Sequence, residues 1–151
     1  MVIQAIKRTP PSQSLSLTHH SQPCQTESDK VTLASLNCNS LGDRRKTARV
    51  LDYVSTQNKD FFALIDTRTD NKSEYNIKSK CKGRVFCIHG TSNSKGLILI
   101  VHQRLTDIKI THEILHQGQI SKFSYKINDR QYNLLVVYGP SDKDDHKFFS
   151  Q

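Results

Sequence analysis

The hydrophobic residues of this chain fall into segments with two different periods. Residues 31–36 and 61–65 are short apolar runs, and the second run is continuous, which is typical of a strand covered on both faces of its sheet. Between these runs, residues 44–57 carry one apolar stripe at the spacing i, i+3, i+4 and i+7, formed by Thr47, Val50, Leu51 and Val54. A strand, a helix and a strand in this order predict a right-handed crossover between parallel strands.

After residue 69 the apolar runs become shorter and begin to alternate with polar positions. Further strands are predicted at 84–88, 96–101, 108–112, 123–127 and 131–138. The Asn-Asp-Arg turn at 128–130 joins the last two strands, which predicts a hairpin. The pattern as a whole predicts an α/β class of α+β-like character, in which the 44–57 helix lies on the outer face of a mixed sheet.

The first thirty residues follow neither period. Residues 1–30 contain Pro-Pro and Ser-Gln-Pro segments and few recurring apolar positions, so they are predicted to be a disordered tail. The rest of the chain, residues 31–151, has the length of one domain. Residues 144–151 are predicted to begin a helix.

The charge of the chain favours a polyanionic partner. The sequence has 22 Lys and Arg residues against 14 Asp and Glu, a formal net charge of +8. Nucleic acid is the first expected partner and DNA the favoured form, although a basic charge also serves solubility alone. The basic residues gather between positions 71 and 104 and at the start of the predicted helix. The predicted nucleic-acid-binding residues are Arg44, Arg45, Lys72, Lys78, Lys80, Lys82, Arg84 and Lys95.

The four cysteines, at positions 24, 38, 81 and 87, show no zinc-finger or redox spacing. Buried free thiols in a reducing compartment are the simplest interpretation, which places the protein inside the cell, in the nucleus or cytoplasm. A metal cluster of Cys81, Cys87 and His89 is an alternative, but its spacing fits no regular site. No apolar stretch of spanning length and no signal-peptide core is found in the sequence, so no membrane partner is expected.

Polar side chains follow three of the predicted strands where those strands end. Asn37 ends the first, Asp66 follows the second, and Tyr138 ends the last. The carboxyl ends of strands are where ligands bind in α/β sheets, and an amide oxygen with a carboxylate can hold a hard divalent cation. Each residue also has a purely structural interpretation. Asn37 and Asn39 can cap a loop, Asp66 can cap a turn, and Tyr138 can close the core.

Four short segments occur in an order known from one protein family. They are LNCNSL at 36–41, LIDT at 64–67, SKGLIL at 94–99 and VVYGP at 136–140. The chain resembles the endonuclease/exonuclease/phosphatase superfamily over residues 31 to 149, and within it the apurinic-endonuclease-like domain of non-LTR retrotransposons. The resemblance implies the N-terminal half of a four-layer α/β/β/α sandwich.

The resemblance also implies a function, namely Mg²⁺-dependent hydrolysis of a phosphodiester by a DNA endonuclease. Asn37 and Tyr138 would be catalytic, with Asn37 orienting the scissile phosphate and Tyr138 stabilising its developing charge. Asp66 would bind the metal. Asn39 would be a polar group next to the residues that contact the metal and the phosphate, without contacting them itself. The implied partners are DNA and the missing half of the domain or a reverse transcriptase region.

The sequence departs from the family at several points. Asp66 stands where the family has glutamate, Ser40 replaces a glycine, and Ile65 replaces a glutamine. The family's later G-D-x-N and S-D-H segments are not found, and Asp-Asp-His at 144–146 comes too early to replace them. Catalysis is therefore left open. The chain is expected to be part of an Mg²⁺-dependent nuclease that is inactive alone, or a non-catalytic fragment that at most binds nucleic acid electrostatically; a phosphatase is a third alternative. Half a sandwich is also expected to expose the inner face of one sheet and to be unstable.

Overall fold

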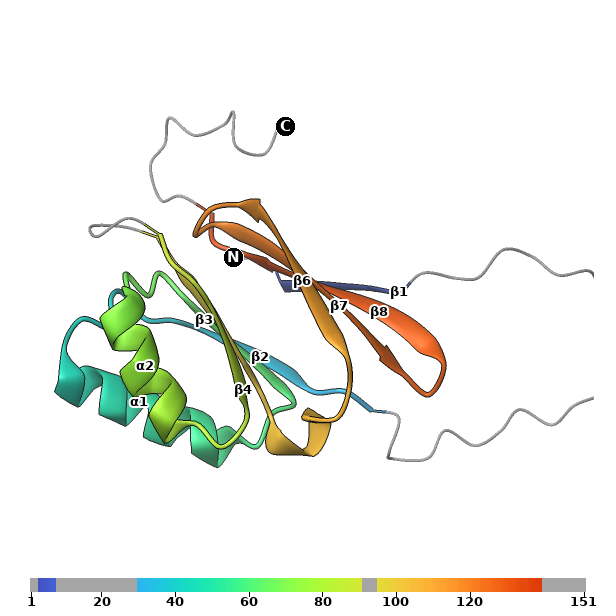
Figure 1. The fold of residues 1–151 in the computed structure, drawn as a ribbon, viewed down its shortest axis with the longest axis horizontal. Helices are drawn as coiled ribbons and strands as arrows, with labels where there is room; N and C mark the ends of the chain where they lie inside the picture. Colours follow the sequence, from blue (N-terminus) through green and yellow to red (C-terminus); the bar gives the residue numbers. More distant parts are fainter. Residues whose placement is uncertain (1–2, 8–29, 91–94, 140–151) are drawn as a thin grey trace, which may run out of the picture.

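The computed structural model of the protein describes residues 3–7, 30–90 and 95–139. These residues form two four-stranded sheets that pack face to face, and two helices cover the outer face of one sheet (Figure 1). The α/β class with a mixed sheet and a flanking helix, as predicted from the sequence, is confirmed.

The sheet that carries the helices is mixed. Its strands, in order across the sheet, are β2 (Leu33–Asn37), β3 (Phe61–Ile65), β5 (Leu97–Val101) and β4 (Arg84–Ile88). β2 and β3 are parallel, with Leu33 opposite Phe61 and Asn37 opposite Ile65, and the other pairs are antiparallel. The predicted crossover between adjacent parallel strands is therefore confirmed.

The helix of the crossover, α1 (Arg44–Gln57), has the predicted bounds. It begins at Asp43, whose Oδ1 accepts a hydrogen bond from the Lys46 N–H at 2.7 Å, and it ends at Asn58 in the left-handed conformation. The predicted stripe faces the sheet, since Thr47 and Leu51 are buried and Val50 and Val54 are half-buried.

A second helix, α2 (Asn71–Lys80), was not predicted. Its sequence carries no apolar stripe, and only one of its residues, Ile77, is buried. The helix instead begins at a strong cap, because the Asp70 Oδ1 accepts hydrogen bonds from both the N–H and the hydroxyl of Ser73.

The other sheet is antiparallel throughout. Its strands, in order across the sheet, are β1 (Ile3–Lys7), β8 (Arg130–Val137), β7 (Ile120–Ile127) and β6 (Ile110–His116). The predicted hairpin is present as β7 and β8. Within residues 1–30, predicted to be a disordered tail, the structure describes one strand, β1, which pairs with β8 so that Ile3 lies opposite Val136. The helix predicted at 144–151 lies outside the described residues.

The two sheets and the helices enclose two hydrophobic cores. One lies between the sheets and includes Phe61, Leu99 and Phe123; the other lies between the mixed sheet and the helices and includes Leu64 and Ile77. The inner faces of both sheets are thus packed against each other. The expectation that one of them is exposed is wrong, because β7 and β8 supply the second sheet from within this chain.

Candidate functional site

Two of the predicted site residues lie together because their strands are parallel. Asn37 is the last residue of β2 and pairs with Ile65, which directly precedes Asp66. The loop after β2 then follows the turn after β3, with the Ser40 N–H donating a hydrogen bond to the Asp66 carbonyl at 2.8 Å. Asn37 and Asp66 are therefore neighbours at one end of the mixed sheet.

Tyr138 is brought to the same end through the antiparallel sheet. Its N–H donates to the carbonyl of Gln119 at 2.8 Å, while the neighbouring Gly118 carbonyl accepts from the Gly96 N–H at 2.8 Å. The Gly96 carbonyl in turn accepts from the Thr67 N–H at 3.1 Å. This series of backbone bonds joins the ends of the two sheets. We call this part of the molecule, with Asn37, Asp66, Arg68, Lys95 and Tyr138, the Asp66 end.

The Asp66 carboxylate is held by an arginine from its own turn. Its Oδ1 and Oδ2 accept hydrogen bonds from the Arg68 Nε and Nη2, both at 3.0 Å. Asp66 is buried, with 4% of its surface exposed, and both residues have positive φ angles of 54° and 49°. The hydrogen bond to Asp66 raises the pKa of Arg68, and Tyr138 lies close enough to add to that effect.

This geometry does not fit a magnesium site. Both oxygens of the carboxylate that would bind the metal already accept from a guanidinium, and Mg²⁺ needs several oxygen ligands in near-octahedral geometry. Within residues 30–90 and 95–139, no three His, Cys, Asp or Glu side chains are grouped to hold a metal ion. A second cation is also near, since the Lys46 Nζ donates to the Asn39 carbonyl at 2.6 Å. Two cations, Arg68 and Lys46, therefore lie around the single carboxylate of Asp66.

The two asparagines form a turn. The Asn37 Oδ1 accepts a hydrogen bond from the Asn39 N–H at 3.0 Å, and both side chains are exposed. Asn39 and Ser40 have positive φ angles of 44° and 74°, which Asn tolerates better than most residues. Loop capping is thus one role that Asn37 performs, while its exposed position also leaves it on the surface of the Asp66 end.

Of the three cysteines that the structure describes, Cys38 is buried and Cys81 and Cys87 are half-buried, and all three are free thiols. Burial raises the pKa of Cys38 and of Cys87 to about 12, and it raises the pKa of Cys81 as well. His89 does not join them in a metal cluster. Its Nε2 lies 2.7 Å from the Glu74 Oε2, which fastens α2 to the end of β4.

The predicted basic residues divide into several groups. Arg44, Arg45 and Lys72 are exposed at the starts of the two helices, which follow the loops of the Asp66 end. Lys95 is half-buried at the Asp66 end itself, and its carbonyl accepts from the Arg68 N–H at 2.9 Å. Lys78 is exposed but forms an ion pair with Glu74 at 2.5 Å.

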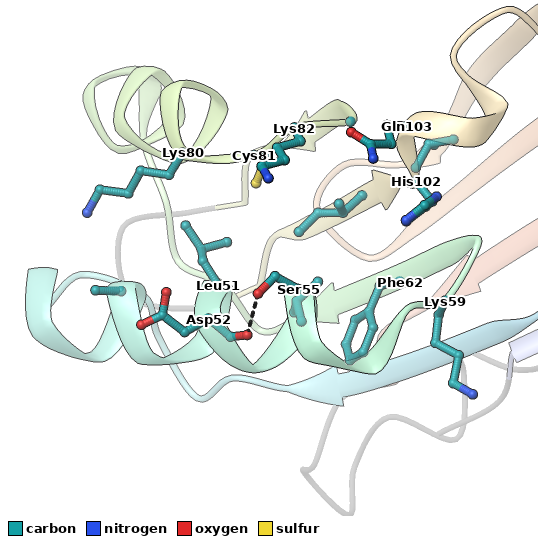
Figure 2. A pocket seen from close by; sticks show the side chains of 15 residues that line it. Leu51, Asp52, Ser55, Lys59, Phe62, Lys80, Cys81, Lys82, His102 and Gln103 are labelled. Atoms are coloured by element: carbon teal, nitrogen blue, oxygen red, sulfur yellow. Dashed lines mark hydrogen bonds between the residues drawn. The ribbon is translucent and has the colours of Figure 1, made fainter.

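Lys80 and Lys82 lie at the far end of α2, where they line a pocket of about 680 Å³ (Figure 2). Its other walls come from α1, from Phe62 at the start of β3, and from His102 and Gln103 after β5. The pocket is therefore at the opposite end of the mixed sheet from Asp66. Lys82 therefore lies at the opposite end of the mixed sheet from Asn37 and Asp66.

Arg84, one of the predicted nucleic-acid-binding residues, makes contacts within the protein. Its side chain is half-buried, and the Nη2 donates to the carbonyls of Leu105 at 3.0 Å and Ile108 at 2.7 Å. Its guanidinium also lies 6.0 Å from the centre of the Phe86 ring. Arg84 thus joins β4 to the segment before β6, a structural role that does not suit contact with nucleic acid.

Arg68, at the Asp66 end, and Lys46, beside it, are not among the site residues predicted from the sequence. Arg68 is the bidentate partner of Asp66, and the signal for it was an arginine two positions after a carboxylate in the same turn. Lys46 belongs to the basic start of the predicted helix but is not predicted to join the site. Its contact with the Asn39 carbonyl depends on how α1 folds back, which no local pattern shows.

Neither a family model nor a curated protein matches the sequence. Neither α1 nor α2, the helices of the described part of the chain, is long and apolar enough to cross a membrane.

Proposed function

We propose that this chain binds the phosphate backbone of nucleic acid, DNA in the first instance, at the Asp66 end and does not hydrolyse it. We further propose that its scaffold is the four-layer sandwich of the endonuclease/exonuclease/phosphatase superfamily. Three layers, helices, mixed sheet and antiparallel sheet, are described in that order. The fourth would lie on the outer face of the antiparallel sheet.

The observation that carries the proposal is the bidentate pair of Asp66 and Arg68. In this pair the carboxylate that the family uses for metal is neutralised, while a planar guanidinium is held in a fixed orientation at the sheet end. Because Asp66 takes the Nε–Nη2 edge of this guanidinium, a phosphate would bind at its other edge, between Nη1 and Nη2. The exposed Arg44, Arg45 and Lys72 lie beside it and extend the positive surface for a polyanion.

Hydrolysis requires more than this set of residues provides. Phosphoryl transfer needs a positioned nucleophile and stabilisation of the charge on the phosphate. Asn37 is exposed and Tyr138 packs against the core between the sheets, while Asp66 is engaged by Arg68 and does not activate water.

Mg²⁺-dependent cleavage is the competing function. The common position of Asn37, Asp66 and Tyr138 at one end of the sandwich favours it. The two hydrogen bonds from Arg68 to the Asp66 carboxylate argue against cleavage, because they occupy the oxygens that would bind Mg²⁺.

Binding to a short DNA duplex, followed by fluorescence anisotropy over a salt titration, tests the proposal. The double variant Arg44→Glu/Arg45→Glu should bind about tenfold more weakly and show a salt slope smaller by about two. The matched control is Lys109→Glu/Lys126→Glu, which changes the same charge at exposed positions near the other end of the antiparallel sheet. The control should change affinity far less.

The proposal is overturned if the two double variants lose affinity equally, or if the wild-type chain does not bind at low salt. A parallel assay follows supercoiled plasmid with Mg²⁺. Robust nicking that requires Asp66 supports the competing function instead.

A further inference from the structure

A second pocket lies between α1 and α2 and extends from the starts of both helices, beside the Asp66 end, to Lys80 at the end of α2. Its volume is about 610 Å³, and its lining includes Arg44, Asp70, Lys72, Tyr75, Asn76 and Lys80. Leu41 and Gly42, from the loop that follows β2, complete the side nearest Asp66, since the Leu41 N–H donates to the Thr67 carbonyl at 2.7 Å. We call it the interhelix pocket.

The charges of the interhelix pocket favour an anion. Three basic side chains line it, from both helices, against the single carboxylate of Asp70. That carboxylate is engaged in capping α2, and its hydrogen bonds with Ser73 lower the pKa of Asp70. Both sequence regions rich in basic residues, the start of the first helix and the segment after residue 71, therefore meet in one place.

Tyr75 is the unusual member of the lining. Its surface is 79% exposed, the largest fraction among the large hydrophobic side chains of the described residues. An aromatic ring in water costs free energy unless a partner covers it, and a ring flanked by cations is the arrangement that stacks on nucleic-acid bases. Asn76, next to it, adds an amide that can hydrogen-bond to a base edge.

We propose that the interhelix pocket binds one unpaired nucleotide of single-stranded nucleic acid, with its base on Tyr75 and its phosphates against Arg44 and Lys72. The volume suits a single nucleotide and is too small for a duplex. A base in a duplex is already stacked and paired, so Tyr75 gains nothing from it. This inference rests on the proposed function, because a strand bound at the Asp66 end continues past Leu41 into the pocket.

The test compares a short fluorescent oligothymidylate with a duplex of the same length, again by anisotropy. Tyr75→Leu removes the flat ring but keeps an apolar residue of high helix propensity at an exposed helical position, so the fold is retained. It should weaken binding of the single strand about tenfold and leave duplex binding unchanged. Tyr75→Phe keeps the ring and should bind both probes as the wild type does.

A charge comparison completes the experiment. Lys72→Glu should weaken binding of the single strand, whereas Lys59→Glu, in the pocket at the opposite end of the sheet, should not. The inference is overturned if Tyr75→Leu binds the oligothymidylate as tightly as the wild type does, or if it weakens both probes equally. In either case duplex binding, and with it the proposed function, still stands. If neither probe binds at low salt, both the inference and the proposed function fail.

Discussion

Two aspartates stand at the two ends of the same strand and make a direct comparison. Asp60 precedes β3 and Asp66 follows it; both are buried, with 3% and 4% of their surfaces exposed, and both pair with an arginine. Their partners differ. Asp60 accepts hydrogen bonds from the Thr32 N–H and hydroxyl at 2.8 and 2.9 Å and from the Arg104 Nε. Asp66 is held by Arg68, two residues away.

The difference separates a structural carboxylate from a candidate functional one. Asp60 ties the start of β2 and the segment after β5 to the start of β3, so its bonds exist only when the sheet is assembled. The Asp66–Arg68 pair lies within one turn and closes no distant contact. The Asp66 carboxylate is buried, but the Arg68 side chain that it holds is 32% exposed and open to a ligand, so we expect the pair to matter for binding and Asp60 for stability.

The largest expected effect is on stability at Asp60. Asp60→Ala leaves the Thr32 N–H and Arg104 without their partner, and the free energy of unfolding should fall by about 3 kcal/mol. Urea unfolding followed by circular dichroism measures this loss. Asp66→Asn should cost less, about 1 kcal/mol, because asparagine keeps an acceptor oxygen in place and the partly exposed Arg68 side chain can turn to water. Equal losses would remove the distinction between the two aspartates.

The next largest expected effect is on the free energy of unfolding at Gly96, in the backbone beside the Asp66 end. Gly96 has a φ of 106°, and a Cβ there would lie 2.6 Å from the Thr67 Oγ1. Gly96→Ala should therefore lower the free energy of unfolding by about 2 kcal/mol through strain and crowding. Gly42→Ala is a suitable control, since its Cβ would lie 3.4 Å from the nearest atom, the Ser40 Oγ. A Gly96→Ala chain as stable as the control would show that this turn is looser than described.

Acid should remove part of the stabilisation that Asp60 provides. Burial favours the protonated form of Asp60, but the hydrogen bonds from Arg104 and Thr32 outweigh burial and lower its pKa. A lowered folded pKa means that its stabilisation is complete above the unfolded pKa of about 3.9 and is lost as pH falls through the folded value. The wild-type free energy of unfolding should thus fall below about pH 4.

Asp60→Asn should show a shallower fall over the same range, measured by urea unfolding at a series of pH values. Asp70 and Glu74, whose pKa values are also lowered, keep their contribution in this variant. Identical pH dependence in wild type and variant would contradict the assignment.

The smallest effect concerns the thiol nearest the Asp66 end. Burial raises the pKa of Cys38 to about 12, so little thiolate exists at neutral pH. Site-resolved alkylation should modify Cys38 much more slowly in the folded chain than in urea. Rapid modification of the folded chain would show that this end opens readily.

Much of the fold followed from the sequence because it depends on local periodicity. β3 and β4 and the α1 helix have the predicted bounds, and the parallel pairing of β2 and β3 followed from the helix between them. α2 was missed because Ile77 is its only buried residue and a stripe needs several. β1 was missed because a five-residue strand gains its stability from β8, at the other end of the sequence.

The site was predictable only where geometry follows from strand direction. Asn37 and Asp66 meet because parallel strands end at the same edge. The partner of Asp66 was not predicted, since a sequence does not show which way Arg68 turns after a residue of positive φ. The carbonyl contacts of Arg84 were not predictable either, since counting basic residues by segment does not show which of them donate to carbonyls, as Arg84 does to Leu105 and Ile108.

The affinity of Asp66→Asn for duplex DNA at low salt tests the central claim most directly. Asparagine accepts the positive φ of 54°, so the turn is kept while the negative charge is removed and the Arg68 fork is released. If the Asp66 end binds phosphate, the variant should bind DNA several-fold more tightly than wild type, with or without Mg²⁺. Weaker binding, or loss of an Mg²⁺-dependent nicking activity present in the wild type, would contradict the account.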